Sequence, residues 1–210
     1  MIEVVHCMPK HIEPLALVLA RAFAQDPLYE YAFPDPRNRT SLASWEMRGL
    51  LRYGLRFGEA TAPPSLVGCA VWLPPGQTDF TEARMAQVDM LGLAEHIGQE
   101  ADKRLTQFNE ATEVVHRRLL PTPHWYLLLL AIDPAYQRQG IGSALLAPML
   151  RKANQTRHPI YLETTNQKNL PFYEQHGFEV RVQERLASDG PTVWYMVRRP
   201  PSPRRRSPSA

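Results

Sequence analysis

The stretch LLLLAIDPAYQRQGIGSALLA, residues 127–147, decides the fold of this chain. Leu127–Ile132 is an unbroken apolar run, which is typical of a strand buried on both faces of a sheet. Asp133-Pro134 ends that strand, because proline donates no backbone hydrogen bond and restricts the residue before it. Gln137–Ser143 contains two glycines and predicts a tight turn into a helix. A strand, a glycine-rich turn and a helix in this order indicate an α/β domain.

The turn before this helix suits a phosphate group. A helix start presents backbone N–H groups without partners and the positive end of the helix dipole. The pattern is [Gln/Arg]-x-x-Gly-x-[Gly/Ala], filled by Gln137, Gly140 and Gly142. It is neither the three-glycine dinucleotide fingerprint nor the G-x-x-x-x-G-K-[ST] phosphate loop. The pattern by itself leaves two interpretations open, a pyrophosphate-binding turn and a plain strand-to-helix turn.

Composition places the chain among soluble globular proteins of one domain. It has 210 residues, of which 44% are hydrophobic and 21% charged. The formal net charge of +3 misleads, because five arginines and no acid lie in the last 13 residues. Without those five arginines, the rest of the chain has 19 of the 24 basic residues and all 21 acidic residues, so its net charge is slightly negative. We therefore expect no nucleic-acid partner for the body of the chain.

Several classes of protein are excluded by what the sequence lacks. No apolar run reaches the roughly 18 to 20 residues of a membrane span, and the N-terminus shows no signal pattern. Cys7 and Cys69 are far apart and indicate reduced thiols. No cluster of His, Cys or acidic residues has the spacing of a metal site. We expect a cytoplasmic protein with no membrane partner and no metal.

The remaining patterns predict a single domain over residues 1–199 and a disordered Pro/Arg/Ser tail over 200–210. A helix-rich segment at about 78–120 reads as an insertion between strands. The aromatic stretch 28–33 is either a short buried element or the wall of a substrate pocket. The expected strands are 2–6, 66–73, 127–132, 159–165, 178–186 and 192–197, and the expected helices are 12–23, 37–57, 81–94, 99–119, one from 141 and one within 166–176.

Three motifs resemble a known family. The Gln137–Gly142 pattern resembles the acetyl-CoA signature of the GCN5-related N-acetyltransferases (GNAT). The runs LETT at 162–165 and NLPFYE at 169–174, followed by Gly177-Phe178, resemble more narrowly the branch that contains puromycin N-acetyltransferase. The strong resemblance covers about residues 125–199, and the N-terminal half, which contributes much of the acceptor site in this family, matches only loosely.

The resemblance implies a fold and an activity. The fold is a mixed, twisted central sheet, splayed at its centre and flanked by helices. The activity is acetyl-CoA-dependent transfer of an acetyl group to the amine of a small molecule, directly within a ternary complex, and homodimers occur in the family. Two rival functions are a protein or peptide N-alpha acetyltransferase and a non-catalytic CoA-binding sensor. The residues implied for acetyl-CoA are Gln137, Arg138, Gln139, Gly140, Ile141, Gly142 and Ser143 for the pyrophosphate, Ala131, Ile132 and Asp133 for pantetheine, and Asn169.

The resemblance also implies catalytic residues. Tyr173 matches the family's proton donor to the departing thiolate, and its alternative role is that of a core aromatic. Glu163 is our candidate for the base, since in a strand it shares a face with Tyr161 and would be costly to bury without a task. The alternative is a carboxylate that holds the amine without taking its proton. His124, at a strand start, is expected at the surface, and its alternative position is one that faces the acceptor.

Overall fold

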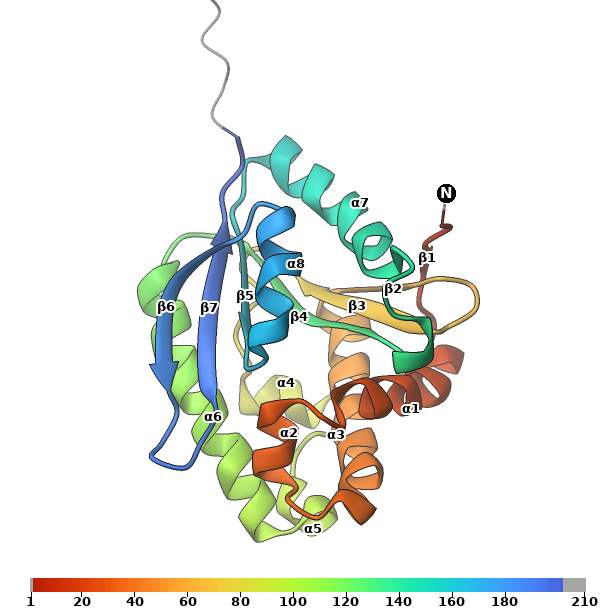
Figure 1. The fold of residues 1–210 in the computed structure, drawn as a ribbon, viewed down its shortest axis with the longest axis vertical. Coiled ribbons are helices and arrows are strands. Elements are labelled where there is room, and N and C mark those ends of the chain that lie inside the picture. Colours follow the sequence, from red (N-terminus) through yellow and green to blue (C-terminus); the bar gives the residue numbers. More distant parts are fainter. Residues whose placement is uncertain (1, 202–210) are drawn as a thin grey trace, which may run out of the picture.

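The computed structural model describes residues 2–201 of the chain as a seven-stranded mixed sheet between two layers of helices (Figure 1). The strand order is β1-β2-β3-β4-β5-β7-β6. Every neighbouring pair is antiparallel except β4 and β5, which run parallel. The strands are β1 Val5–His6, β2 Glu59–Ala62, β3 Gly68–Leu73, β4 Trp125–Ile132, β5 Ile160–Thr164, β6 Glu179–Arg185 and β7 Thr192–Arg198.

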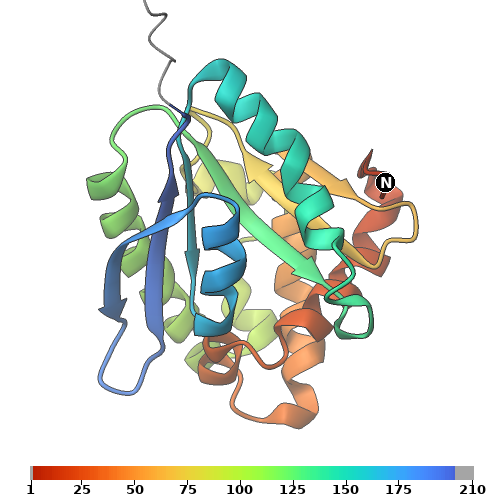
Figure 2. The ribbon, with the colours of Figure 1, turned by 45° about the horizontal axis from the view of Figure 1, so that its top comes forward.

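Helices cover both faces of the sheet. α7 and α8 lie on one face, and α1, α3 and the α4–α6 segment lie on the other, as Figures 1 and 2 show together. The tail beyond residue 201, which we expect to be disordered, lies outside the described residues. The helices are α1 Ile12–Phe23, α2 Pro27–Ala32, α3 Pro36–Phe57, α4 Glu82–Ala86, α5 Leu93–Ile97, α6 Gln99–Leu119, α7 Ile141–Thr156 and α8 Leu170–Gln175.

Most predicted elements are confirmed, two predictions are wrong, and one strand was not predicted. The single helix expected at 81–94 is two short helices, α4 and α5. Asp89 and Gly92, both with positive φ, lie between them in a backbone conformation that does not continue a helix. The strand expected at 2–6 shrinks to β1. The four-residue strand β2 escaped prediction, because it is too short for its alternation to stand out after the long α3.

A β-bulge in β4 changes which of its apolar side chains face each of the two helix-covered sides of the sheet. Leu127 pairs with Trp72 and Leu129 pairs with Val71, so Leu128 is the extra residue. The bulge shifts the alternation of side chains by one position. Trp125 and Leu127 therefore share a core with Leu130 and Ile132 beneath α7, whereas Leu129 and Ala131 face α1 and α3.

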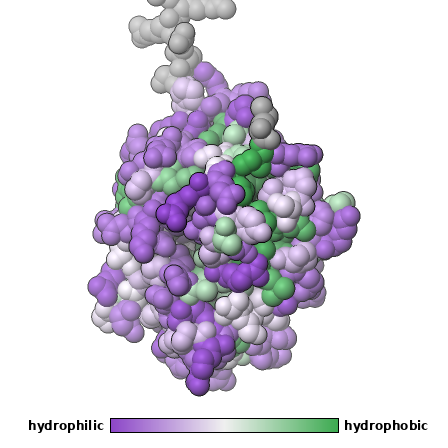
Figure 3. All heavy atoms as spheres, turned by 45° about the vertical axis from the view of Figure 1, so that its right-hand side comes forward, coloured by the Kyte–Doolittle hydropathy of each residue, from purple (hydrophilic) through white to green (hydrophobic). Residues whose placement is uncertain are grey.

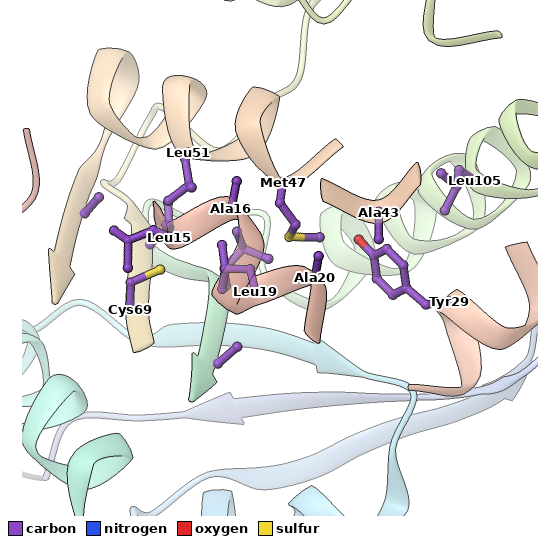
Figure 4. Close-up of a cluster of buried hydrophobic side chains, with 14 of the residues drawn as sticks. Leu15, Ala16, Leu19, Ala20, Tyr29, Ala43, Met47, Leu51, Cys69 and Leu105 are labelled. Atoms are coloured by element: carbon purple, nitrogen blue, oxygen red, sulfur yellow. The ribbon is translucent and has the colours of Figure 1, made fainter. Parts of the chain in front are cut away.

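The core on the α1 side is tightly packed (Figure 4). Leu15 and Leu19 of α1 lie against Met47 and Leu51 of α3, and all four are at most 1% exposed. Burial of one such side chain contributes roughly 1.5–3 kcal/mol. Hydrophilic residues cover most of the face drawn in Figure 3. Within the described chain, no helix combines the length and apolarity needed to cross a bilayer.

Candidate active site

The sheet opens between β4 and β5. Their parallel ladder holds only two residue pairs, Trp125 with Ile160 and Tyr126 with Tyr161. Beyond Tyr126 the edge of β4 that faces β5 has no strand partner. A cavity of about 940 Å³ extends from this opening toward α2, α3 and α6. This volume is at the upper end for small-molecule sites, so the cavity has room for two reactants.

Glu163 lies on β5 at the centre of the cavity wall. The Tyr126 hydroxyl of the neighbouring strand donates a hydrogen bond to its Oε1, and its Oε2 is buried without a partner among the described residues. Burial raises the pKa of Glu163 to about 7, although the hydrogen bond from Tyr126 opposes this shift. A carboxyl group with this pKa accepts a proton near neutral pH.

Tyr173 of α8 lines the same cavity and is 7% exposed. Its ring packs edge to face against Phe172 and Phe178, at centroid distances of 5.4 and 5.8 Å. Its hydroxyl makes no hydrogen bond to any described residue. Burial, together with the nearby carboxylates of Asp26 and Glu163, raises the pKa of Tyr173 well above its ordinary value. The hydroxyl therefore holds its proton in the free protein.

Asp26 is a second buried carboxyl group beside the reaction centre. It caps α2 by accepting from the Leu28 N–H at 3.0 Å, and it accepts from the Thr165 hydroxyl at 2.5 Å. The Thr165 bond joins α2 to the end of β5. Burial raises the pKa of Asp26.

A pair of histidines forms the wall near α6. Nδ1 of His124 lies 2.6 Å from the Thr122 carbonyl oxygen, which only accepts, so Nδ1 carries the proton. Burial lowers the pKa of both imidazoles, to about 3 for His116, so both rings are neutral. Nε2 of His124 is then an acceptor for the His116 Nε2–H at 2.6 Å. Nδ1 of His116 remains as an acceptor without a partner among the described residues.

A third carboxyl group, Glu46, enters the cavity from the middle of α3. It is 9% exposed, and its Oε2 accepts from the Tyr29 hydroxyl at 2.9 Å. Figure 4 shows Tyr29 reaching from α2 toward α3 with this hydroxyl. Burial raises the pKa of Glu46 to about 7.

The predicted pyrophosphate loop has a geometry that suits an anion. Gly140 has a φ of +80° and is the N-cap of α7, without a side-chain cap. The N–H groups of Ile141, Gly142 and Ser143 have no partner within the helix. Arg138 also has a positive φ. A Cβ atom on Gly142 would lie 3.1 Å from Cζ of Phe172, which explains the preference for glycine there.

The strand residues predicted for pantetheine lie just beyond the stretch of β4 that lines the cavity, residues 126–130. The Ile132 carbonyl accepts from the Gln137 side chain at 3.1 Å, which ties the loop to the strand. Asp133 is paired with Arg21 of α1, and this pairing lowers the pKa of Asp133. Asn169 lines the cavity and lies 3.4 Å from the Thr164 hydroxyl.

One expectation about an individual side chain is wrong. His124, expected at the surface, is 5% exposed because α6 covers the start of β4. Cys69, distant from the loop in sequence, pairs with Ala131 in the sheet. Its thiol is fully buried beneath α1, and burial raises its pKa, so the thiol stays protonated. Residues 2–201 contain no group of three or more potential metal ligands.

The structure thus brings Glu163, Tyr173 and Asn169 to one cavity, with the glycine loop at the far end of β4. Sequence reasoning missed Asp26, Glu46 and His116. Asp26 precedes Pro27, a recognisable N-cap signal. Glu46 and His116 carry no motif, because each sits inside a long amphipathic helix.

Comparisons with known proteins agree with this geometry. Residues 93–180 match the family model of the acetyltransferase (GNAT) domain. The uncharacterized N-acetyltransferase C550.08 of Schizosaccharomyces pombe is 25% identical over 151 residues, which are 68% of this chain and 60% of that protein. The chain thus spans about three fifths of that relative.

Two solved structures share the fold over nearly the whole chain. A histone acetyltransferase HPA2 and related acetyltransferase from Corynebacterium glutamicum is 23% identical with a TM-score of 0.70, over 97% of this chain and 99% of that one. The polyamine N acetyltransferase of Drosophila melanogaster is 17% identical with a TM-score of 0.56, over 95% and 100% of the two chains. This chain therefore has the GNAT fold, and its residues 93–180 are similar to the acetyltransferase (GNAT) domain.

Proposed function

We propose that the chain is an acetyl-CoA-dependent N-acetyltransferase that acts on the amine of a small molecule. The observation that carries the proposal is the shared cavity, into which a buried carboxyl group, a free phenol and an unpaired strand edge all open. Glu163, Tyr173 and β4 supply these three features. A sensor that only binds CoA has no use for a base poised near pH 7.

The residues present fit acetyl-CoA. The free N–H groups of Ile141–Ser143 would hold its pyrophosphate, and the open edge of β4 would pair with its pantetheine arm. Acetyl-CoA would supply an acetyl group activated as a thioester. A backbone N–H that polarises the thioester carbonyl is worth roughly 3–4 kcal/mol. The bulge at Leu128 lies in the stretch of β4 that lines the cavity, so a backbone N–H of this stretch is our candidate for that donor.

Glu163 and Tyr173 would divide the proton transfers. An ammonium must lose a proton before it attacks, and Glu163 is the buried base within the cavity. The negative charge of Glu163 helps to raise the pKa of Tyr173. Once Glu163 takes the proton, that charge is neutralised and Tyr173 becomes a stronger acid toward the departing thiolate. The two steps are thereby coupled through one carboxyl group.

The helices that cover the cavity favour a small molecule as acceptor over a protein chain. Arg104 of α6 donates to the Tyr31 carbonyl of α2 at 2.7 Å. Trp45 of α3 stacks on His96 of α5 with centroids 4.2 Å apart. These contacts fasten the helical segment over the cavity, whereas a peptide needs an open groove. Puromycin as acceptor, a cytoplasmic location and a homodimer remain predictions.

The proposal is tested by comparing Glu163→Gln and Tyr173→Phe with the parent chain. Turnover of acetyl-CoA with an amine should fall at least tenfold in both variants, while calorimetric binding of acetyl-CoA stays within about twofold. Unchanged turnover in both variants would contradict the assigned roles. Binding without turnover in the parent, across all amine classes, would support the sensor instead.

A further inference from the structure

The cavity has a second negatively charged site, Glu46, which takes no part in the proposed acetyl transfer. We call it the second pole, and Glu163 is the first. Glu46 lies on α3, whereas Glu163 lies on β5, and the two carboxyl groups have different hydrogen-bond partners, Tyr29 and Tyr126. Its Oε2 accepts from Tyr29, and its Oε1 has no partner among the described residues. A carboxylate that is nine-tenths buried is costly unless a cation or several hydrogen bonds accompany it.

No cation of the described chain neutralises Glu46. Arg48, two residues away on the same helix, pairs with Glu13 at 2.7 Å. Arg104 of the facing α6 is directed at the Tyr31 carbonyl and stacks over its ring. Arg48 and Arg104 therefore have other partners, and no ion pair to Glu46 forms among the described residues, so the counter-charge is left for a ligand to supply.

Acidic residues also outnumber basic residues in the lining of the whole cavity. Its acidic residues are Asp26, Glu46, Asp79, Asp102, Glu110, Glu113 and Glu163, and its only lysine or arginine is Arg117. Arg117 is paired with Glu113 at 2.5 Å and lies 3.7 Å from Asp79. An excess of acids in a low-dielectric cleft attracts and holds cations. Side chains such as Leu50, Leu105 and Phe108 also line the cavity and give it an apolar wall.

A second unpaired acceptor supports a ligand rich in donors. His116 is 9% exposed, is neutral and carries its proton on Nε2, which is committed to His124. Its Nδ1 makes no hydrogen bond to any described residue, and His116 lines the cavity. A neutral ring in this tautomer accepts from an N–H group and does not repel a cation.

We propose that the acceptor is a diamine or polyamine, with one amine acetylated beside Glu163 and a second ammonium group held by Glu46. This inference rests on the proposed function and names the substrate class of the same site. The alkyl chain between two ammonium groups matches the apolar wall of the cavity. Tyr29 orients Glu46 by donating to its Oε2, which leaves Oε1 for the second ammonium group of the ligand.

The test compares α,ω-diaminoalkanes with the n-alkylamines of the same carbon number. The readout is kcat/KM from release of CoA thiol. The parent chain should prefer the diamine at least tenfold. Glu46→Gln should raise KM for the diamine at least tenfold and leave kcat and the monoamine within about twofold. Tyr29→Phe removes the hydrogen bond that orients Glu46 and favours its carboxylate form, so this variant should weaken the preference for the diamine less than Glu46→Gln does. Glu100→Gln removes an exposed charge of α6 outside the cavity and serves as the control.

A binding measurement keeps the inference separate from the proposed function. Calorimetry of 1,4-diaminobutane with the parent and with Glu46→Gln needs no turnover. At least tenfold weaker binding by the folded variant supports the second pole even if no amine is acetylated. Equal binding by the two proteins, or an equal loss of activity toward monoamines and diamines, overturns it. Acetylation of monoamines and diamines with equal efficiency would leave the proposed function standing and the diamine inference refuted.

Discussion

Replacing Glu46 by glutamine tests whether burial of the Glu46 carboxylate lowers the free energy of unfolding. Burial raises the pKa of Glu46 from 4.5 to about 7. The folded protein thus binds this proton more tightly than the unfolded chain. The contribution of Glu46 to the free energy of unfolding is therefore fully present below pH 4.5 and is lost as the pH rises through about 7. At about 1.4 kcal/mol per pH unit, the loss approaches about 3 kcal/mol above that pH.

Glutamine does not titrate, and its carbonyl oxygen still accepts from Tyr29. The free energy of unfolding of Glu46→Gln should therefore rise relative to the parent by about 2–3 kcal/mol between about pH 5 and about pH 8. Urea unfolding followed by circular dichroism at both pH values measures this change. Glu3→Gln, at an exposed position, is the control and should show no such trend. A difference between variant and parent that is the same at both pH values would refute the reasoning.

Four further outcomes are expected. The parent kcat/KM should rise with pH through about 7 as Glu163 loses its proton, and a pH–rate profile of Glu163→Gln should lack this limb. Tyr173→Phe should lower kcat with acetyl-CoA affinity nearly unchanged, and an unaltered kcat would return Tyr173 to a packing role. Gly142→Glu puts a charge against the predicted pyrophosphate site, so calorimetry should show at least tenfold weaker acetyl-CoA binding, with the melting temperature reporting any packing loss against Phe172. Leu19→Ala in the fully buried core should lower the free energy of unfolding, measured with urea, by about 2–5 kcal/mol. A decrease under about 1 kcal/mol would contradict the packing described.

The C-terminal half of the fold could be predicted because its signals are local. The apolar run of β4, the glycine turn and the Gly177 helix end each specify a backbone conformation over a few residues. Gly177 has a φ of +82°, as a C′ glycine requires. The same locality explains why Glu163, Tyr173 and Asn169 could be named from short motifs.

The side of the cavity formed by α3 and α6, where we propose that the acceptor binds, could not be predicted in this way. Glu46 and His116 become functional candidates only when α3 and α6 pack around the opening in the sheet. Within each helix they look like ordinary polar positions of an amphipathic pattern. His124 was misplaced for the same reason, since nothing near it in sequence shows that α6 covers it. Long-range packing, which periodicity does not encode, sets the acceptor wall.

The central claim is that this cavity transfers an acetyl group from acetyl-CoA to a small amine. The most direct measurement is release of CoA thiol from acetyl-CoA across matched monoamines, diamines, arylalkylamines, puromycin and an N-terminal peptide. The account predicts turnover with a small amine, none with the peptide, and loss of that turnover in Glu163→Gln. Turnover with the peptide alone, or turnover that Glu163→Gln leaves intact, would contradict it.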